Sequence, residues 1–277
     1  MATVDTLNFI IQQMHIYFGI SIIAIGVLGN LSNIIIFSTL KTFRETSCGF
    51  YLIVLSIVNM GEMVISLMIR VFNEGFKINL TRHSVVCKMH SFIIIWSLLM
   101  SLAILCSATI DQLISISKYR QYSNQRIARR IVLVLCLIVG LYSSIFPIFW
   151  DSPTGVCAST SPAVARYSTT FQYPVLFGFL PLTTITVFSS LAFYKSRTIT
   201  SRNINIVRLS RDRQLTAMTL CHALFVVVTQ LPFVIVFIYT TSQTNLDAEQ
   251  TARNKLIYTI TVLIEYSNFA VSSFRST

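Results

Sequence analysis

Residues 87–113 read CKMHSFIIIWSLLMSLAILCSATIDQL, and this stretch decides the fold. Between Met89 and Ile110 it contains no Asp, Glu, Lys or Arg, and about 20 such residues in a helix cross the hydrocarbon layer of a membrane. Asp111 follows Cys87 by 24 positions, which corresponds to about 36 Å in an α-helix. The stretch therefore predicts one membrane-spanning helix, with Cys87 at one end and Asp111 at the other.

The composition of the whole chain leads to the same class of protein. Hydrophobic residues make up 54% of the 277 residues, charged residues make up 11%, and the mean hydropathy is +0.70. Soluble domains carry about 25% charged residues, and disordered chains are polar and charged, so both classes are excluded. Lipid rather than water must meet most of the outer surface.

Six further apolar stretches are of similar length. Together the seven predict spans at about residues 16–40, 49–71, 87–117, 130–150, 167–194, 210–240 and 255–274. Each should be an α-helix, because backbone groups in hydrocarbon must bond within their own segment. None alternates as a barrel strand does. We therefore expect an all-α membrane protein, a single seven-transmembrane helix bundle over residues 1–277.

The distribution of Lys and Arg predicts the orientation. With the N-terminus outside and the C-terminus inside, the inner loops carry about twice as many Lys and Arg as the outer loops, as the positive-inside rule requires. This bias accounts for the net charge of +11 without a nucleic-acid partner. Residues 79–81 form a glycosylation sequon in the first outer loop, so Asn79 is expected to be modified. The first apolar stretch should act as an uncleaved signal anchor.

Two of the six cysteines lie where a disulfide is expected. Cys87 is at the outer end of the third span, and Cys157 is in the outer loop after the fourth. Both face an oxidising compartment, so they can pair; two free cysteines are the alternative. A bridge would hold this loop across the top of the third helix.

A series of motifs along nearly the whole chain resembles the rhodopsin-like G-protein-coupled receptor family, and among its subfamilies the divergent invertebrate peptide-type receptors. They are Gly29-Asn30, Leu55 with Asn59, Cys87 with Cys157, Asp111-Gln112-Leu113, Pro147, Phe179-Leu180-Pro181-Leu182, Gln230-Leu231-Pro232-Phe233, and residues 268–274 from Asn268 to Phe274.

The resemblance implies a multi-pass plasma-membrane receptor that binds an extracellular ligand and activates a heterotrimeric G protein, with no cofactor and no metal. The implied mechanism is an outward movement of the sixth helix, which pivots at Pro232. The residues expected to serve activation or G-protein contact are Asp111, Gln112, Arg126, Arg211, Arg213, Pro232, Asn268 and Ser272. Positive-inside topology and attraction to anionic lipid are the alternative explanation of the basic residues.

Gln112 departs from the family's pattern, which has Arg at this position. Asp111 therefore lacks its neighbouring cation, and we expect it to pair with Lys118, Arg120 or an Arg of the third inner loop.

Two further departures lie in the spans. Asn59 replaces the Asp that ligates sodium in the family, and Ser272 and Ser273 replace the Asn and Pro of the seventh helix. These changes count against a sodium site and against the usual activation relay.

Two acidic residues within spans are candidates for the ligand site, Glu62 in the second and Glu265 in the seventh. Charges within spans cost about 3 kcal/mol on insertion scales and usually face the bundle interior. Helical spacing puts them on the faces of Asn59 and Asn268, so both should point into one pocket in the outer half. They either bind a cationic group of a peptide or small molecule, or stay neutral or hydrogen-bonded to neighbours such as Tyr266.

Three other residues are expected around this pocket. Ile94 stands where biogenic-amine receptors have an Asp, which favours a peptide or another small molecule over a simple amine. Arg70 either holds an anionic end of the ligand or extends to lipid headgroups, and the second reading is favoured. Gln230 replaces the usual aromatic residue at the pocket floor and should have a hydrogen-bond partner.

Two other functions compete with a signalling receptor. Gln112 and Ser273 favour a non-signalling decoy or partner receptor of the same fold. A transporter or channel is less favoured, because the two halves show no repeat. An enzyme is not expected, because no nucleophile–base set, metal cluster or phosphate-binding loop is present in the sequence.

Overall fold

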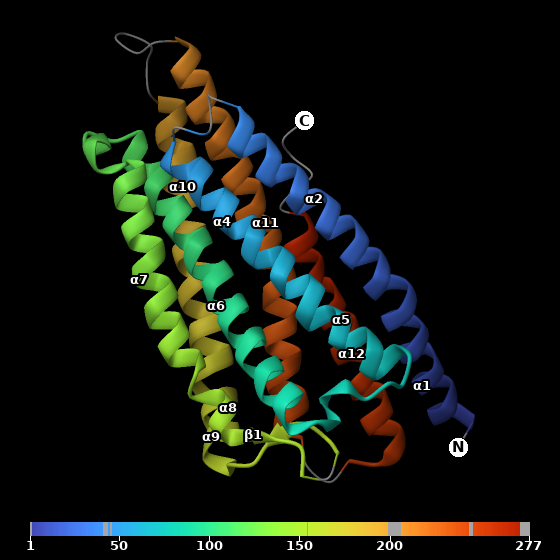
Figure 1. The fold of residues 1–277 in the computed structure, drawn as a ribbon. Helices are drawn as coiled ribbons and strands as arrows, with labels where there is room; N and C mark the ends of the chain where they lie inside the picture. The colour runs from blue at the N-terminus through green and yellow to red at the C-terminus, as the bar shows by residue number, and fades with distance from the viewer. Residues whose placement is uncertain are drawn as a thin grey trace.

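The computed structural model describes residues 2–40, 44, 46–153, 155–198, 206–243 and 246–271. These residues form seven long helical rods that run side by side in one bundle (Figure 1). The predicted fold class, an all-α membrane protein with a seven-helix bundle, is confirmed.

The rods follow one another in chain order, and several contain π-helical turns. The first comprises α1 (Ala2–Met14), a π-helical turn (His15–Gly19) and α2 (Ile20–Thr39); the second comprises α4 (Ser47–Gly61), a π-helical turn (Glu62–Leu67), α5 (Met68–Arg70) and another such turn (Val71–Gly75). The third is α6 (Ser84–Ser115), and the fourth is α7 (Gln125–Ser143) with α8 (Phe146–Phe149). The fifth comprises α9 (Pro162–Tyr167), a π-helical segment (Ser168–Phe179) and α10 (Leu180–Thr198); the last two are α11 (Ile206–Ser242) and α12 (Ala248–Val271).

The rods extend beyond the apolar stretches that predicted them. The first begins at Ala2 rather than near residue 16, because α1 still packs against α12 and buries Ile11. Side-chain caps fix two other starts: Thr46 Oγ1 accepts a hydrogen bond from Gly49 N at 3.0 Å, and Asn124 Oδ1 accepts one from Ile127 N at 3.1 Å. The end of the expected seventh span, residues 272–274, lies outside the described residues.

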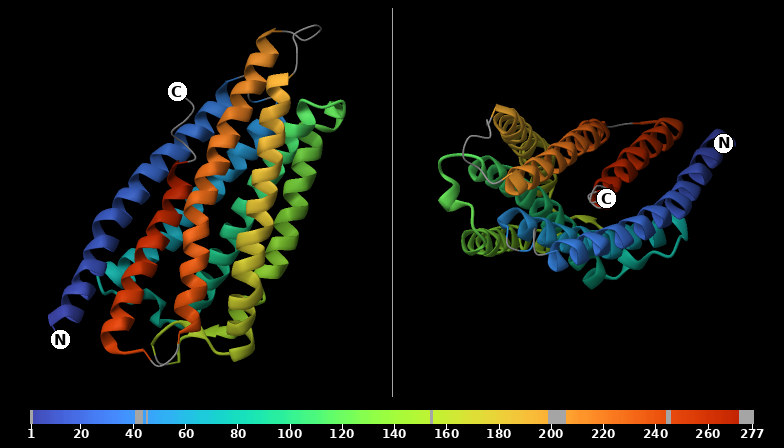
Figure 2. Two further views of the ribbon diagram at one scale, coloured as in Figure 1. Left: turned by 180° about the vertical axis from the view of Figure 1, so that it is seen from behind. Right: turned by 90° about the horizontal axis from the view of Figure 1, so that it is seen from above.

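Among the described residues, 6 helices are long and apolar enough to cross a membrane. α12 is the rod that these criteria leave out. It carries Glu249, Arg253 and Lys255 near its start and Glu265 further along. Its place in the bundle comes from its packing against α11, α1 and α2 (Figure 2). The seventh rod is therefore held by its neighbours more than by its hydrophobicity.

α6 forms the centre of the bundle. It packs against α4, α7, α10 and α11, and its Ile104, Leu105 and Ala108 are almost fully buried. α7 lies at the rim (Figure 1), and its Leu133 and Leu141 are exposed. Such side chains suit contact with lipid, which matches the apolar composition of the chain.

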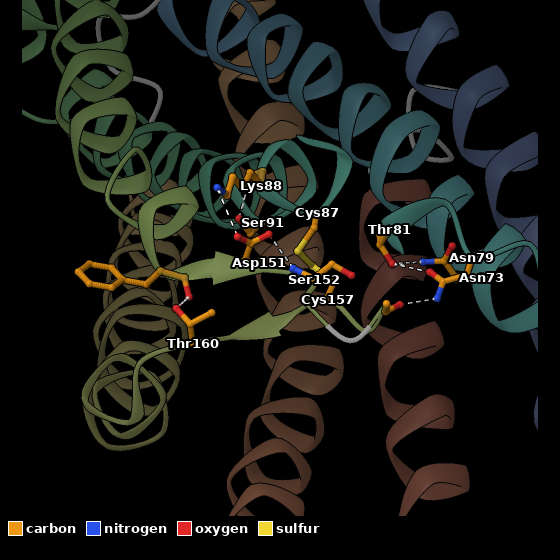
Figure 3. The surroundings of a disulfide bond; sticks show 12 residues. Asn73, Asn79, Thr81, Cys87, Lys88, Ser91, Asp151, Ser152, Cys157 and Thr160 are labelled. Carbon is orange, nitrogen blue, oxygen red and sulfur yellow. Dashed lines mark hydrogen bonds and ion pairs between the residues drawn. A yellow bond between two sulfur atoms is a disulfide. The ribbon is translucent and has the colours of Figure 1, made fainter. Parts of the chain in front are cut away.

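A disulfide joins the start of α6 to the loop after α8 (Figure 3). Cys87 and Cys157 are bonded, with 5.5 Å between their Cα atoms, so the pairing expected from the sequence is confirmed. This loop forms a short antiparallel hairpin of β1 (Trp150–Asp151) and β2 (Ala158–Ser159). Asp151 Oδ2 lies 3.7 Å from Lys88 Nζ. We call this end of the bundle the disulfide end.

The loop before α6 is tied to the same hairpin loop. Asn79 is exposed, and its Nδ2 donates to the backbone oxygen of Gly155 at 2.8 Å, while its Oδ1 accepts from Thr81 Oγ1 at 3.1 Å (Figure 3). Gly155 adopts a φ of 82°, which glycine tolerates and other residues rarely adopt. The two loops thus form one cap over the disulfide end.

Replacing Cys87 or Cys157 by Ser should lower the thermal unfolding midpoint of the purified protein, because a lost disulfide commonly costs about 2–4 kcal/mol. The double variant should be no less stable than either single variant, since both remove one bond. Cys136→Ser, at an exposed position on α7, is the matched control and should leave the midpoint unchanged. An unaltered midpoint in Cys87→Ser would contradict a structural role for the bond.

Candidate functional site

Three charged side chains from two rods meet inside the bundle, and we call Glu62, Arg70 and Glu265 the acid–arginine cluster. Glu62 and Arg70 come from the second rod and Glu265 from α12. Glu62 is 3% exposed and Glu265 is 5% exposed, and each interacts electrostatically with Arg70. Burial at this level requires compensation, because hydrocarbon offers charged groups neither water nor counter-ions.

Glu62 connects three rods through hydroxyl groups. Its carboxyl group is hydrogen-bonded to the hydroxyl of Ser97 on α6. The hydroxyls of Ser66 and Tyr266 lie beside the same carboxyl group, and they are hydrogen-bonded to each other at 2.7 Å. The π-helical turn Glu62–Leu67 holds both Glu62 and Ser66, and such turns occur frequently at functional sites.

Arg70 points into the bundle, not toward lipid headgroups. Its guanidinium carbon lies 6.0 Å from the ring centroid of Tyr258, and Tyr266 also interacts with the group. Its Nε is buried and has no hydrogen-bond partner among the described residues. The sequence favoured an Arg70 side chain that extends to lipid headgroups, and this expectation was wrong. Two buried carboxyl groups and two phenol groups of α12 attract the guanidinium inward.

Glu265 differs from Glu62 in its surroundings. It interacts electrostatically with Glu62 and Arg70, but no hydrogen bond reaches its carboxyl group within the part of the chain that the structure describes. The cluster therefore contains two acids and one guanidinium, and for Glu265 no donor is found among the described residues.

Four aromatic rings lie beside the cluster, and we call Tyr173, Phe233, Phe237 and Tyr258 the aromatic wall. Tyr173 stacks on Phe237 with 3.7 Å between ring centroids and meets Phe233 edge-on at 5.9 Å. Tyr258 lies 6.3 Å from Phe233. Tyr173 interacts electrostatically with Glu62, Glu265 and Arg70, which places the wall next to the cluster. Aromatic faces attract cations. The aromatic wall and the carboxyl group of Glu265 therefore both suit a cationic ligand group.

A small polar cavity lies further from the disulfide end, among α4, α6, α11 and α12. Gln230 and Asn268 line it together with Asn59, Ser101 and His222. Ser101 Oγ donates to Asn59 Oδ1 at 2.9 Å, whereas Gln230 Nε2 and Asn268 Oδ1 are buried without partners in the described part of the chain. We expected a hydrogen-bond partner for the side-chain amide of Gln230, but its Nε2 has none among the described residues. The described lining has no carboxylate, so these residues do not fit a sodium ion.

At the opposite end of the bundle, Asp111 is held by hydroxyl groups. Ser47 Oγ donates to Asp111 Oδ2 at 2.5 Å and lies 2.9 Å from Ser123 Oγ, and Ser123 also interacts with the carboxyl group. Within the described residues, Asp111 makes no ion pair with Lys118 or Arg120; the Arg side chains of the third inner loop, the other expected partners, lie outside the described residues. Ser47 begins α4 next to this carboxyl group and donates a hydrogen bond to it.

The remaining predicted residues do not gather at one point. Ile94 is half-buried on α6, and Ser97, three positions further along, is the residue that reaches Glu62. Gln112 is buried beside Asp111 in sequence, and Arg126 is exposed in the first turn of α7.

Three of the predicted residues lie partly or wholly outside the described residues. Arg211 and Arg213 lie in α11 near its start, but their side chains are outside the described part, as is all of Ser272. Pro232 lies within α11, which continues as one helix to Ser242.

Sequence reasoning missed Ser66, Ser97 and the aromatic wall. Ser66 follows Glu62 by one helical turn, a spacing that places two side chains on one face and could have identified it. Phe233 and Phe237 share the same spacing on α11. Ser97 gave no comparable signal, because its contact with Glu62 joins two different rods.

The bundle, its capping disulfide and its interior polar sites define a seven-helix membrane protein. The family model described as 7 transmembrane receptor (rhodopsin family) matches residues 29–271. The match spans most of the chain, so the chain belongs to the rhodopsin family of seven-transmembrane receptors. Comparison with curated proteins finds no match. The protein is thus a multi-pass plasma-membrane protein of a family of receptors rather than enzymes.

Ser47→Ala should destabilise the protein by about 1.5–3 kcal/mol if the carboxyl group of Asp111 is ionised, the range for hydrogen bonds to charged groups. In an Asp111→Ala background the same substitution should cost much less, because its partner is gone. Thermal unfolding of both single variants and the double variant measures this coupling. Ser115→Ala, which removes a hydroxyl bonded to the backbone oxygen of Gln112, is the control. Additive effects of the two substitutions would contradict the assignment.

Proposed function

We propose that the chain is a single receptor domain that binds an extracellular ligand with a cationic group and activates a heterotrimeric G protein. The cationic group belongs to a Lys or Arg side chain of a peptide or to a small molecule. The single observation that carries the proposal is Glu265, a buried acid without a hydrogen-bond donor in the described structure, in a cluster with two acids and one guanidinium.

Charge and chemistry both favour a cation at this site. Arg70 compensates one carboxylate, so the ionised cluster would hold one uncompensated negative charge, which costs about 3 kcal/mol on insertion scales. A cationic ligand group near Glu265 removes that cost. Tyr173 and Tyr258 lie beside the cluster and add cation–π attraction of about 1–2 kcal/mol when the group is desolvated.

The orientation in this proposal places the disulfide end outside. Cys87, Cys157 and Asn79 lie at that end, and the loops richest in Lys and Arg follow the other ends of α6 and α10. A disulfide forms in the oxidising compartment, and basic loops stay on the cytoplasmic side. These two independent features favour the N-terminus outside and the C-terminus inside.

The proposed route from ligand to G protein runs along α11. Phe233 and Phe237 belong to the aromatic wall, Gln230 lines the polar cavity, and Pro232 lies between these positions. A ligand that contacts the wall therefore acts on the part of α11 that contains the proline. Outward movement of the helix opens a cleft for the G protein if the ligand binds the open state more tightly than the closed state.

The basic residues at the inner end are proposed to contact the G protein. Arg126 is exposed in the first turn of α7, and Arg211 and Arg213 lie in the first part of α11. Attraction to anionic lipid, about 1 kcal/mol per basic residue, is a second role for the same charges.

A non-signalling receptor is the alternative, and the surroundings of Asp111 favour it. Among the described residues its carboxyl group is held by the hydroxyls of Ser47 and Ser123, and Gln112 replaces the family's Arg. A ligand-stimulated nucleotide-exchange assay separates the two functions. Absence of exchange, together with its recovery in Gln112→Arg, would establish the decoy.

Glu265→Gln should lower the potency of cationic ligands at least tenfold, equivalent to about 1.4 kcal/mol, because it removes the acid that meets the cation. The measurement is nucleotide exchange in membranes with a promiscuous G protein and a panel of Arg- or Lys-containing peptides and amines.

The matched control is Glu74→Gln, which removes an acid that pairs with Lys255 at 2.8 Å outside the cluster. It should leave potency within twofold. Equal potency in wild type and Glu265→Gln would remove Glu265 from the ligand site.

Asn79→Gln should raise the electrophoretic mobility of the protein made in cells, because Asn79 lies on the side where glycans are added. Glycosidase treatment of the wild type should produce the same shift and serves as the control. If neither treatment changes the band, glycosylation no longer supports the proposed orientation.

A further inference from the structure

We propose that the outward face of α7 binds one anionic phospholipid, with the headgroup at Arg126 and Arg130 and an acyl chain along Leu133, Leu137 and Leu141. The lipid site is separate from the acid–arginine cluster. Binding there requires neither an extracellular ligand nor a G protein.

α7 leaves one of its faces uncovered. It packs against α6 and α4 and lies at the rim of the bundle (Figure 1). Ala128 and Val139 are buried on the packed side. On the other side, Leu133, Leu137 and Leu141 are 64%, 67% and 72% exposed. These leucines form an apolar column that lipid must cover.

Two arginines continue the column of leucines toward the start of α7. Arg126, Arg130, Leu133, Leu137 and Leu141 follow one another at spacings of four, three, four and four residues. Such spacings place side chains on one face of a helix, and both arginines are exposed. The column is therefore cationic at one end and apolar over the rest, which complements the two parts of an anionic phospholipid.

The length of the column matches one leaflet of a bilayer. Leu141 follows Arg130 by 11 positions, which corresponds to about 16 Å in an α-helix. The hydrocarbon core is about 30 Å thick, so each leaflet contributes about half of it. An acyl chain whose headgroup lies at Arg130 can therefore follow the column as far as Leu141.

The charges at the start of α7 suit an anion. The first turn contains no acidic residue, and neither Arg126 nor Arg130 forms an ion pair with another described residue. Arg129 turns to α4 instead, and its guanidinium carbon lies 5.8 Å from the ring centroid of Phe50. This cation–π contact occupies Arg129 and leaves the outward pair for a headgroup.

The segment before α4 fixes this end of α7 and adds a further cation. The side-chain amide of Gln125 donates to the backbone oxygen of Arg44, and the side chain of Arg44 is exposed. Clusters of basic residues next to a membrane-spanning helix attract anionic lipids of the cytoplasmic leaflet. The proposed orientation places the start of α7 in that leaflet, so phosphatidylserine is a suitable probe.

Native mass spectrometry of the purified protein in detergent, with equal amounts of phosphatidylserine and phosphatidylcholine added, tests the headgroup contact. We expect the wild type to retain phosphatidylserine about tenfold more than phosphatidylcholine, because each basic residue near the headgroup adds attraction. Arg126→Gln combined with Arg130→Gln should lose most of this preference. Arg126→Lys combined with Arg130→Lys should keep it, since the charges remain.

Arg82→Gln combined with Arg253→Gln is the matched control. Both residues are exposed, Arg82 in the loop before α6 and Arg253 near the start of α12. The pair changes the net charge by the same amount, away from the start of α7, and should leave the preference for phosphatidylserine unchanged. Thermal unfolding without added lipid verifies that every variant is folded.

A photoreactive phosphatidylserine tests the position of the acyl chain. With the reactive group midway along one chain, the lipid should label the peptide that contains Leu137, and an excess of ordinary phosphatidylserine should prevent the labelling. Labelling of other rods alone would contradict the site on α7.

Three outcomes of the mass spectrometry would overturn the proposal. They are equal retention of the two lipids by the wild type, an unchanged preference when both arginines of α7 are replaced by Gln, and an equal loss in the control pair or the Lys pair. Because neither a ligand nor a G protein is present, failure here leaves the proposed receptor function untouched.

Discussion

Hydrocarbon supplies neither hydrogen bonds nor counter-ions, and this constraint organises the whole molecule. Backbone groups are satisfied within their own helix, and buried polar side chains are stabilised where their own or another rod supplies a hydrogen-bond partner or an opposite charge. Glu62 is bonded to Ser97, Asn59 to Ser101, and Arg70 turns to the tyrosines of α12. The same contacts that remove these groups from lipid fix how the rods are arranged. Glu265, to which no hydrogen bond is donated in the described part of the chain, is for this reason the centre of the proposed ligand site.

The cap at the disulfide end and the interior sites depend on each other through α6. Cys87 fixes one end of this central rod to the hairpin loop. Ser97 then meets the acid–arginine cluster, Ser101 the polar cavity, and Asp111 the first residue of α4. One rod thus carries a series of polar contacts from one end of the bundle to the other. The proposed ligand site at the first of these contacts is thereby linked through α6 to Asp111.

The sequence predicted those parts of the site that depend on one residue type or on local spacing. The cysteine pair follows from two sulfur atoms on the oxidising side, and the inward direction of Glu62 and Glu265 follows from the cost of charge in lipid. The partner of Asp111 was not predictable in this way. Gln112 removed the expected cation, and serine hydroxyls such as Ser47 occur throughout the chain without a distinguishing signal. Arg70 was misjudged because its direction depends on α12.

The sequence by itself determined that the chain crosses the membrane as seven helices, because hydrophobic length and charge exclusion are local properties of each segment. Only the tertiary structure decided that Glu62 meets a hydroxyl group of another rod, that of Ser97. Helical periodicity assigns side chains to faces, but it does not say which face of another rod each one meets. That choice depends on the rotation and offset of rods far apart in the chain, such as Glu62 with Ser97 and Ser66 with Tyr266.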